Sequence, residues 1–167
     1  FDRKTLISKK RGYFDSWVDK IGMDFHVQFT FGGYYSLMAI LQNLKTSEKS
    51  DFDVLVPSYL CPSMLKPFKA LNVSFRFYRV NESLYVDETH LKEQITNQTA
   101  AVLFIDYFGS SQASRLSAML QELQNKNIRI IQDIVQTIDM AKSNLYGDYV
   151  FNSVRKFLPV EASILLS

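Results

Sequence analysis

Hydrophobic and polar positions follow two periods along this chain, and together they predict alternating helices and strands. Between residues 35 and 45, Leu37, Ile40, Leu41 and Leu44 recur at helical spacing, which indicates an amphipathic helix after the pair Gly32-Gly33. Further helices are predicted over residues 63–71, 87–95 and 114–126. Strands are predicted for the apolar or alternating runs at residues 53–57, 73–80, 100–109, 128–133 and 148–153.

Several of these strands are apolar throughout and are separated by helices, which is typical of a parallel sheet covered on both faces. We therefore predict an α/β protein with three layers, α/β/α, and a mostly parallel sheet. Residues 1–28 are interpreted as an N-terminal segment, in which Tyr13, Phe14 and Trp17 suggest a short helix, and residues 29–167 as one domain. Because the chain stops inside the apolar run 163–167, we interpret it as a piece of a longer protein and expect an open sheet edge there.

Composition narrows the possible functions. The chain has 167 residues, 47% of them hydrophobic, and a net charge of +2 from 19 basic and 17 acidic residues, so neither a nucleic acid nor a membrane is expected as a partner. The single Cys61 excludes an internal disulfide, and His26 and His90 lack partners at metal-ligand spacing, so no metal site is expected. No apolar run reaches the ~20 residues of a membrane span and no signal peptide is evident, which favours a cytoplasmic protein.

Candidate chemistry is expected at the strand ends, because parallel sheets bind ligands beyond the carboxyl ends of their strands. The segments that follow the apolar runs are residues 57–61, 106–109, 133–136 and 153–156. The motifs of dinucleotide-binding folds, P-loops and α/β-hydrolases are absent, since "FGGYYS" supplies only an adjacent glycine pair. Hydride transfer, nucleotide hydrolysis and triad hydrolysis are therefore not favoured.

The strand ends do carry the residue types that a pyridoxal phosphate (PLP) site needs: Asp133, Ser153, Lys156 and the glycine at a helix start, Gly33. A lysine forms the Schiff base, an acid pairs with the pyridine nitrogen, and hydroxyls with helix amides hold the phosphate. Each residue also has a plainer interpretation. Asp133 could cap a helix, the glycine pair could form a turn, Lys156 could be a surface base, and Cys61 could be a small buried hydrophobe.

Five segments in a particular order carry a family resemblance: "FGGYYSLMAIL", "VLVPSYLCPSMLKPFKALNVSFRFYRV", "LYVDETHLKEQITNQTAAVLFIDYFG", "IRIIQDIVQTI" and "GDYVFNSVRKFLPVEASILL". The chain resembles the DegT/DnrJ/StrS-type sugar aminotransferases, PLP-dependent enzymes of fold type I, from about Phe29 to its end. The resemblance implies that Lys156 forms the Schiff base and later moves a proton between substrate carbon and cofactor. It also implies that Asp133 lies against the pyridine nitrogen and that Gln136 contacts the ring hydroxyl.

The remaining positions implied by the resemblance concern the phosphate and the face of the ring. Ser153 and the backbone amides of Gly33 and Tyr34 would bind the phosphate, and Cys61 would lie beside the ring. The family's reaction is the transfer of an amino group, usually from glutamate, to a keto sugar nucleotide in glycan or polysaccharide biosynthesis, carried out by a homodimer. The small C-terminal domain that closes over the substrate in this fold is missing from the chain, so the isolated chain is expected to be inactive.

The chain departs from the family pattern in three places. Only Val154 and Arg155 separate Ser153 from Lys156, a shorter spacing than in many relatives. Ala162 and Ser163 stand where glycines are usual, which would strain the loop if those positions required a positive φ. Gln132 replaces an acid. These departures leave two alternatives open: an inactive relative that serves as a binding or assembly module, and an α/β binding domain unrelated to PLP.

Overall fold

The computed structural model describes residues 25–48, 51–137 and 144–167. Its strands form one seven-stranded sheet in the order β1-β7-β6-β5-β4-β2-β3. The strands are β1 (Val27–Thr30), β2 (Asp53–Pro57), β3 (Ser74–Tyr78), β4 (Thr99–Ile105), β5 (Arg129–Asp133), β6 (Tyr149–Phe151) and β7 (Ser163–Leu166). The helices are α2 (Gly33–Ser47), α3 (Lys66–Leu71), α4 (Glu88–Gln94) and α5 (Ala113–Asn125), with short 3-10 turns η2 (Pro62–Leu65), η3 (Tyr107–Gly109) and η5 (Val154–Lys156).

The sheet is mostly parallel. Strands β3, β2, β4, β5 and β6 pair in parallel, whereas β7 runs antiparallel to both of its neighbours, β6 and β1. Every residue of β2 and β4 is buried, as expected for strands that are covered on both faces. The predicted mostly parallel α/β sheet is therefore confirmed.

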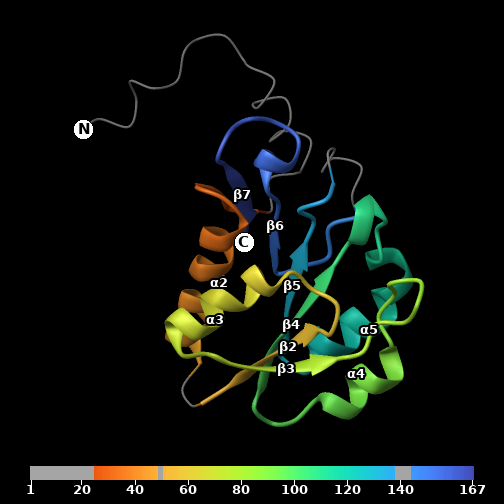
Figure 1. Ribbon diagram of the computed structural model, residues 1–167. Helices are drawn as coiled ribbons and strands as arrows, with labels where there is room; N and C mark the ends of the chain where they lie inside the picture. The colour runs from red at the N-terminus through yellow and green to blue at the C-terminus, as the bar shows by residue number, and fades with distance from the viewer. Residues whose placement is uncertain (1–24, 49–50, 138–143) are drawn as a thin grey trace.

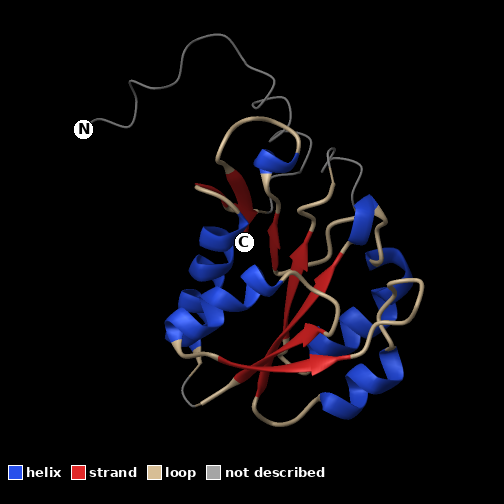
Figure 2. Cartoon of the chain, in the orientation of Figure 1, coloured by secondary structure: helices blue, strands red, loops and turns tan. Residues whose placement is uncertain are grey.

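Helices cover both faces of the sheet, which gives the predicted three layers (Figures 1 and 2). Helices α2 and α3 pack on one face over a core that includes Leu41, Phe68 and Ile131. Helices α4 and α5 pack on the other face over a core that includes Phe104 and Leu120. Because side chains alternate along a strand, neighbouring residues at each strand end belong to opposite faces.

Local sequence signals explain where helices begin and end. Asp87 caps α4 by accepting a hydrogen bond from the backbone N–H of His90 at 3.0 Å. Pro67 lies in the first turn of α3, where a missing N–H leaves no intrahelical bond unmade. The helix predicted over residues 63–71 is therefore divided into η2 and α3, and Asn72, with φ 51°, ends it.

Two features near the chain ends differ from expectation. Strand β7 pairs on both sides, so the prediction of an open edge at residues 163–167 is wrong; the edges of the described sheet are β1 and β3. Strand β1 was not predicted, and it brings Val27 and Gln28 of the N-terminal segment into the sheet. The short helix suggested around Tyr13, Phe14 and Trp17 lies outside the described residues.

Candidate functional site

The N-terminus of α2 lies against the carboxyl ends of β5 and β6. A Cβ atom on Gly33 would be 3.5 Å from the ring of Phe151 and 3.6 Å from the side chain of Val135, so helix and sheet are in van der Waals contact. Gly32 precedes the helix with φ 127°, a conformation that favours glycine. The glycine pair is thus both a turn and the start of the helix.

This helix start offers free backbone donors. The carbonyl of Gly32 accepts hydrogen bonds from the N–H groups of Tyr35 and Ser36 at 2.9 and 3.2 Å. The N–H groups of Gly33 and Tyr34 donate to no other residue in the described part of the chain. Free N–H groups at the positive end of a 15-residue helix dipole form a favourable place for an anion.

Asp133 ends β5 and is almost completely buried, with 3% of its surface exposed. Its side chain points to the α2 face, as does that of Ile131, and its Oδ1 accepts a hydrogen bond from the N–H of Val135 at 2.8 Å. Burial raises the pKa of Asp133 to about 7; the charge of Asp106 also raises it, whereas the Val135 N–H and the charge of Lys156 lower it. This bond to Val135 leads into a turn over residues 134–137, where no helix begins, so it is not the helix cap of the plainer interpretation. The raised pKa marks Asp133 as a functional candidate.

Lys156 lies in η5, directly after the buried Ser153, and its side chain is exposed. Its N–H donates to the Ser153 carbonyl at 3.2 Å, which closes the tight turn that follows β6. The lysine charge acts electrostatically on both Asp133 and Cys61. The short spacing between Ser153 and Lys156 is therefore compatible with a lysine near the buried acid.

Cys61 is exposed, so its interpretation as a small buried hydrophobe is wrong. Its Sγ lies 3.0 Å from the Oγ of Ser63. The hydrogen bonds with Ser63 lower the pKa of the Cys61 thiol, and the positive charges of Lys156 and Lys66 lower it further. The thiol and the lysine are thus close enough to interact electrostatically.

Gln136 is held in place by a neighbouring strand end. Its Oε1 accepts a hydrogen bond from the N–H of Phe108 at 2.5 Å, and Phe108 has a φ of 53°. The Nε2 amide makes no hydrogen bond with other described residues, which leaves it as the group available to a ligand. Gln136 therefore joins the segment after β4 to the segment after β5.

Sequence reasoning missed Tyr107, which connects three of the strand ends. It is 6% exposed, its hydroxyl donates to the carbonyl of Tyr59, and the two rings are 5.7 Å apart. Burial raises the pKa of Tyr107, and the neighbouring Asp133 charge raises it further. The available signal was an aromatic residue directly after the apolar run of β4, in "IDYFG".

A chain of hydroxyl groups lies behind the helix start. The Oγ of the buried Ser36 is 2.8 Å from the Oγ1 of Thr30 and 2.8 Å from the Oγ of Ser163, which donates in turn to the carbonyl of Asn152. Neither Ala162 nor Ser163 has a positive φ. The strain expected from these two replacements of glycine is therefore absent, and Ser163 instead links β7 to α2.

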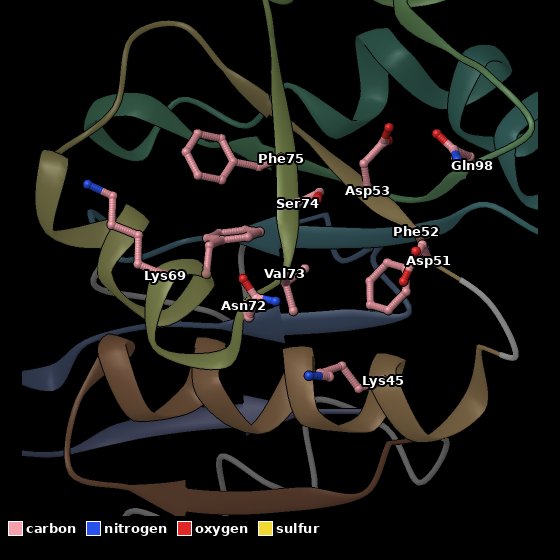
Figure 3. A pocket seen from close by; sticks show the side chains of 11 residues that line it. Lys45, Asp51, Phe52, Asp53, Lys69, Asn72, Val73, Ser74, Phe75 and Gln98 are labelled. Atoms are coloured by element: carbon pink, nitrogen blue, oxygen red, sulfur yellow. The ribbon is translucent and has the colours of Figure 1, made fainter.

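The opposite end of the sheet is hollowed but does not resemble a catalytic site. A cavity of about 690 Å³ lies there, near the amino ends of β2 and β3, lined by residues including Lys45, Asp53 and Phe68 (Figure 3). Asp53 is paired with Arg76 at 2.8 Å, and the Nζ of Lys45 donates to the carbonyl of Leu71 at 2.9 Å. Asp53 and Lys45 are therefore already engaged with partners within the protein.

Residues 25–48, 51–137 and 144–167 contain neither a cluster of metal ligands nor a membrane-spanning helix. These residues contain no group of three or more His, Cys, Asp and Glu side chains that could hold a metal ion. None of their helices is sufficiently long and apolar to cross a membrane.

Solved structures with the same architecture identify the fold. Helicobacter pylori PseC, an aminotransferase in pseudoaminic acid biosynthesis, has a TM-score of 0.72 and 12% identity, over 85% of this chain and 40% of that one. Bacillus subtilis NtdA with bound PMP has a TM-score of 0.70 and 19% identity, over 85% of this chain and 33% of that one. A GDP-4-keto-6-deoxymannose-3-dehydratase with a trapped PLP-glutamate geminal diamine has a TM-score of 0.72 and 15% identity, over 91% of this chain and 42% of that one.

The fold is therefore that of the large domain of PLP-dependent transferases of fold type I. The model of the DegT/DnrJ/EryC1/StrS aminotransferase family matches residues 18–147, and the chain belongs to that family. No protein with a curated description matches it. The chain spans about 40% of the length of the first of these structures. Ser153 and Lys156 lie beyond the matched range, so their placement depends on the geometry of β6 and η5.

Proposed function

We propose that this chain is the cofactor-binding part of a PLP-dependent aminotransferase that transfers an amino group to a keto sugar nucleotide in glycan or polysaccharide biosynthesis. The observation that carries the proposal is the meeting of three chemical groups at one end of the sheet. These are the free amides at the start of α2, the buried Asp133 and the nearby Lys156. Membership of the aminotransferase family supports the same conclusion.

The described residues fit the parts of PLP. The amides of Gly33 and Tyr34 and the hydroxyl of Ser153 would bind the phosphate, since free N–H groups at a helix start bind anions. Asp133 would face the ring nitrogen, the Nε2 of Gln136 the ring hydroxyl, and Cys61 the face of the ring.

When bound, PLP accepts electrons from the substrate carbon from which a proton is removed. Lys156 would hold the cofactor and then, as a free amine, move that proton at the substrate carbon. The carboxylate of Asp133 would hold a proton on the ring nitrogen, because an opposite charge beside a buried acid favours the ionised acid. The aromatic side chain of Tyr107 would exclude water from the region next to Asp133.

The substrates are proposed from the relatives. One solved structure contains glutamate joined to PLP, in an enzyme named for a GDP-linked keto sugar. For this protein we propose a sugar nucleotide as acceptor and glutamate as donor, and a cytoplasmic location with neither nucleic acid nor membrane as partner.

We propose a homodimer, because large apolar side chains are exposed around the candidate site. Those within or next to the elements that carry the site are Phe31, Tyr34, Tyr35, Tyr59, Phe108, Phe157, Leu158 and Val160. The rings of Tyr34 and Tyr35 are 5.1 Å apart, and that of Phe31 is 6.3 Å from Tyr35. The neighbouring rings of Phe31, Tyr34 and Tyr35 form an exposed aromatic cluster, and exposed apolar clusters commonly mark an interface.

The alternative, an inactive relative that acts as a binding or assembly module, was suggested by departures from the family pattern. Two of these departures no longer argue for an inactive protein. Ala162 and Ser163 adopt ordinary φ values, and the charge of Lys156 reaches Asp133 despite the short spacing.

A PLP titration separates the two functions. We expect the protein to develop absorbance between about 320 and 430 nm as PLP binds, and Lys156→Ala to lose the Schiff-base part of that spectrum. Lys66→Ala is the matched control, because Lys66 also acts on Cys61 but is not among the charges acting on Asp133. A wild-type protein that gives no spectral change would favour the inactive module.

A further inference from the structure

A second buried carboxyl group, Asp106, lies beside Asp133 at the end of the neighbouring strand. It follows β4 and is 1% exposed, and its backbone N–H donates to the Asp133 carbonyl at 2.9 Å. The two side chains point to opposite faces of the sheet, Asp133 toward α2 and Asp106 toward the start of α5. Two buried acids are thus held side by side on neighbouring strands.

Each side-chain oxygen of Asp106 accepts one hydrogen bond. Its Oδ1 accepts from the backbone N–H of Gln112 at 2.9 Å, and its Oδ2 accepts from the Nε2 of Gln132 at 2.9 Å. Both donors are neutral amides, so the carboxylate is stabilised without a cation. Burial raises the pKa of Asp106, while these two hydrogen bonds lower it.

Gln132 cannot rotate its amide without breaking other contacts. Its Nε2 also donates to the carbonyl of Asn144 at 3.0 Å, and its Oε1 accepts from the N–H groups of Tyr146 and Gly147 at 3.0 and 3.3 Å. This orientation always presents N–H to Asp106, which favours the ionised acid. An acid at position 132 would instead face the Asp106 carboxylate, which gives a physical reason for glutamine there.

We propose that Asp106 is a positioning residue for the proposed reaction: its carboxylate, held by Gln112 and Gln132, adds a second buried negative charge behind Asp133. That charge strengthens the hold of Asp133 on a cationic ring nitrogen. The inference rests on the proposed function, since it assigns Asp106 a role through Asp133. In the described part of the chain, the titratable groups that interact electrostatically with the Asp133 carboxyl are Asp106, Lys156 and Tyr107.

Carboxyl ¹³C NMR of the cofactor-free chain, labelled at aspartate, tests the coupling without requiring activity. The Asp133 signal is assigned by its loss in Asp133→Asn. In Asp106→Asn we expect the titration midpoint of Asp133 to fall by about one pH unit, because a neighbouring like charge is removed. A structural role alone would change stability and leave this midpoint in place.

The reverse measurement keeps the test decisive if Asp106→Asn does not fold. Coupling between two sites is reciprocal, so the midpoint of Asp106 must fall in Asp133→Asn by a similar amount. An Asp106 midpoint that is the same in wild type and Asp133→Asn would overturn the inference.

PLP binding provides the second readout. A loss of one pH unit of coupling corresponds to about a tenfold change in an equilibrium constant, so we expect Asp106→Asn to bind PLP up to about tenfold more weakly. If PLP binds wild type and Asp106→Asn equally, the positioning role is refuted while the proposed function stands. If wild type binds no PLP, the proposed function fails, and the two carboxyl titrations alone decide whether Asp106 is coupled to Asp133.

Discussion

Replacing Asp133 by asparagine should stabilise the cofactor-free chain at neutral and alkaline pH. The pKa of Asp133 is raised from 3.8 to about 7 in the folded protein, chiefly by burial. Between these values the folded state binds a proton that the unfolded state has lost, so the free energy of unfolding falls as pH rises from about 4 to 7. At 1.36 kcal/mol per pH unit, the raised pKa lowers the free energy of unfolding, relative to its value below pH 4, by about 4 kcal/mol at pH 8 and about 1.5 kcal/mol at pH 5.

Asparagine removes the charge but keeps the Oδ1 that accepts from Val135. Urea unfolding followed by circular dichroism at both pH values therefore measures the effect of the charge. The difference in free energy of unfolding between Asp133→Asn and wild type should be larger at pH 8 than at pH 5. Asp53→Asn is the control, because Asp53 is a buried acid paired with Arg76 at 2.8 and 3.2 Å, and its replacement should destabilise the protein by about 1–3 kcal/mol.

The reasoning would be refuted by either of two results. One is an Asp133→Asn protein no more stable than wild type at pH 8. The other is a stability difference that is equal at pH 5 and pH 8, which would mean that the acid is not held neutral by burial.

Other predictions concern the helix start and the loop after Lys156. Gly32→Ala should lower the free energy of unfolding by about 1–3 kcal/mol in the same urea assay, because φ is 127° at that position. Gly33→Ala should change it by less than about 1 kcal/mol, because Gly33 has no positive φ and an added Cβ would meet its neighbours at an ordinary 3.5 Å. Ser163→Ala should lower it by about 1–2 kcal/mol through the loss of its hydroxyl bonds to Ser36 and Asn152, measured by thermal unfolding. Equal effects of the two glycine variants, or an unchanged melting temperature in Ser163→Ala, would contradict these interpretations.

The elements that the sequence predicted well are those with a strong single pattern. Helix α2 shows its buried stripe in Leu37, Ile40, Leu41 and Leu44, and β4 is apolar along its whole length. Strand β1 was missed because it is an edge strand whose two central residues are exposed, so its pattern is neither alternating nor apolar. The antiparallel direction of β7 also depends on long-range pairing that an apolar run does not reveal.

The candidate site was predicted less completely because its contacts cross between strands. The sequence could suggest Asp133 and Lys156 by type, but the raised pKa of Asp133 arises from burial and from Asp106, 27 positions earlier in the numbering. Gln132 was interpreted as a departure from the family pattern, yet its amide holds Asp106 across the β4–β5 pair. Such roles depend on which face of the sheet each residue occupies, and that requires the register of the strands.

The central claim, that Lys156 is the residue that holds PLP, is tested most directly by borohydride reduction of the PLP-treated protein followed by peptide mass mapping. Reduction makes a lysine–PLP bond permanent, so the modified lysine can be located. We predict that the label is found on the peptide containing Lys156 and is absent from that peptide in Lys156→Ala. A label spread over exposed lysines such as Lys66 and Lys126, or no label on Lys156, would contradict the account.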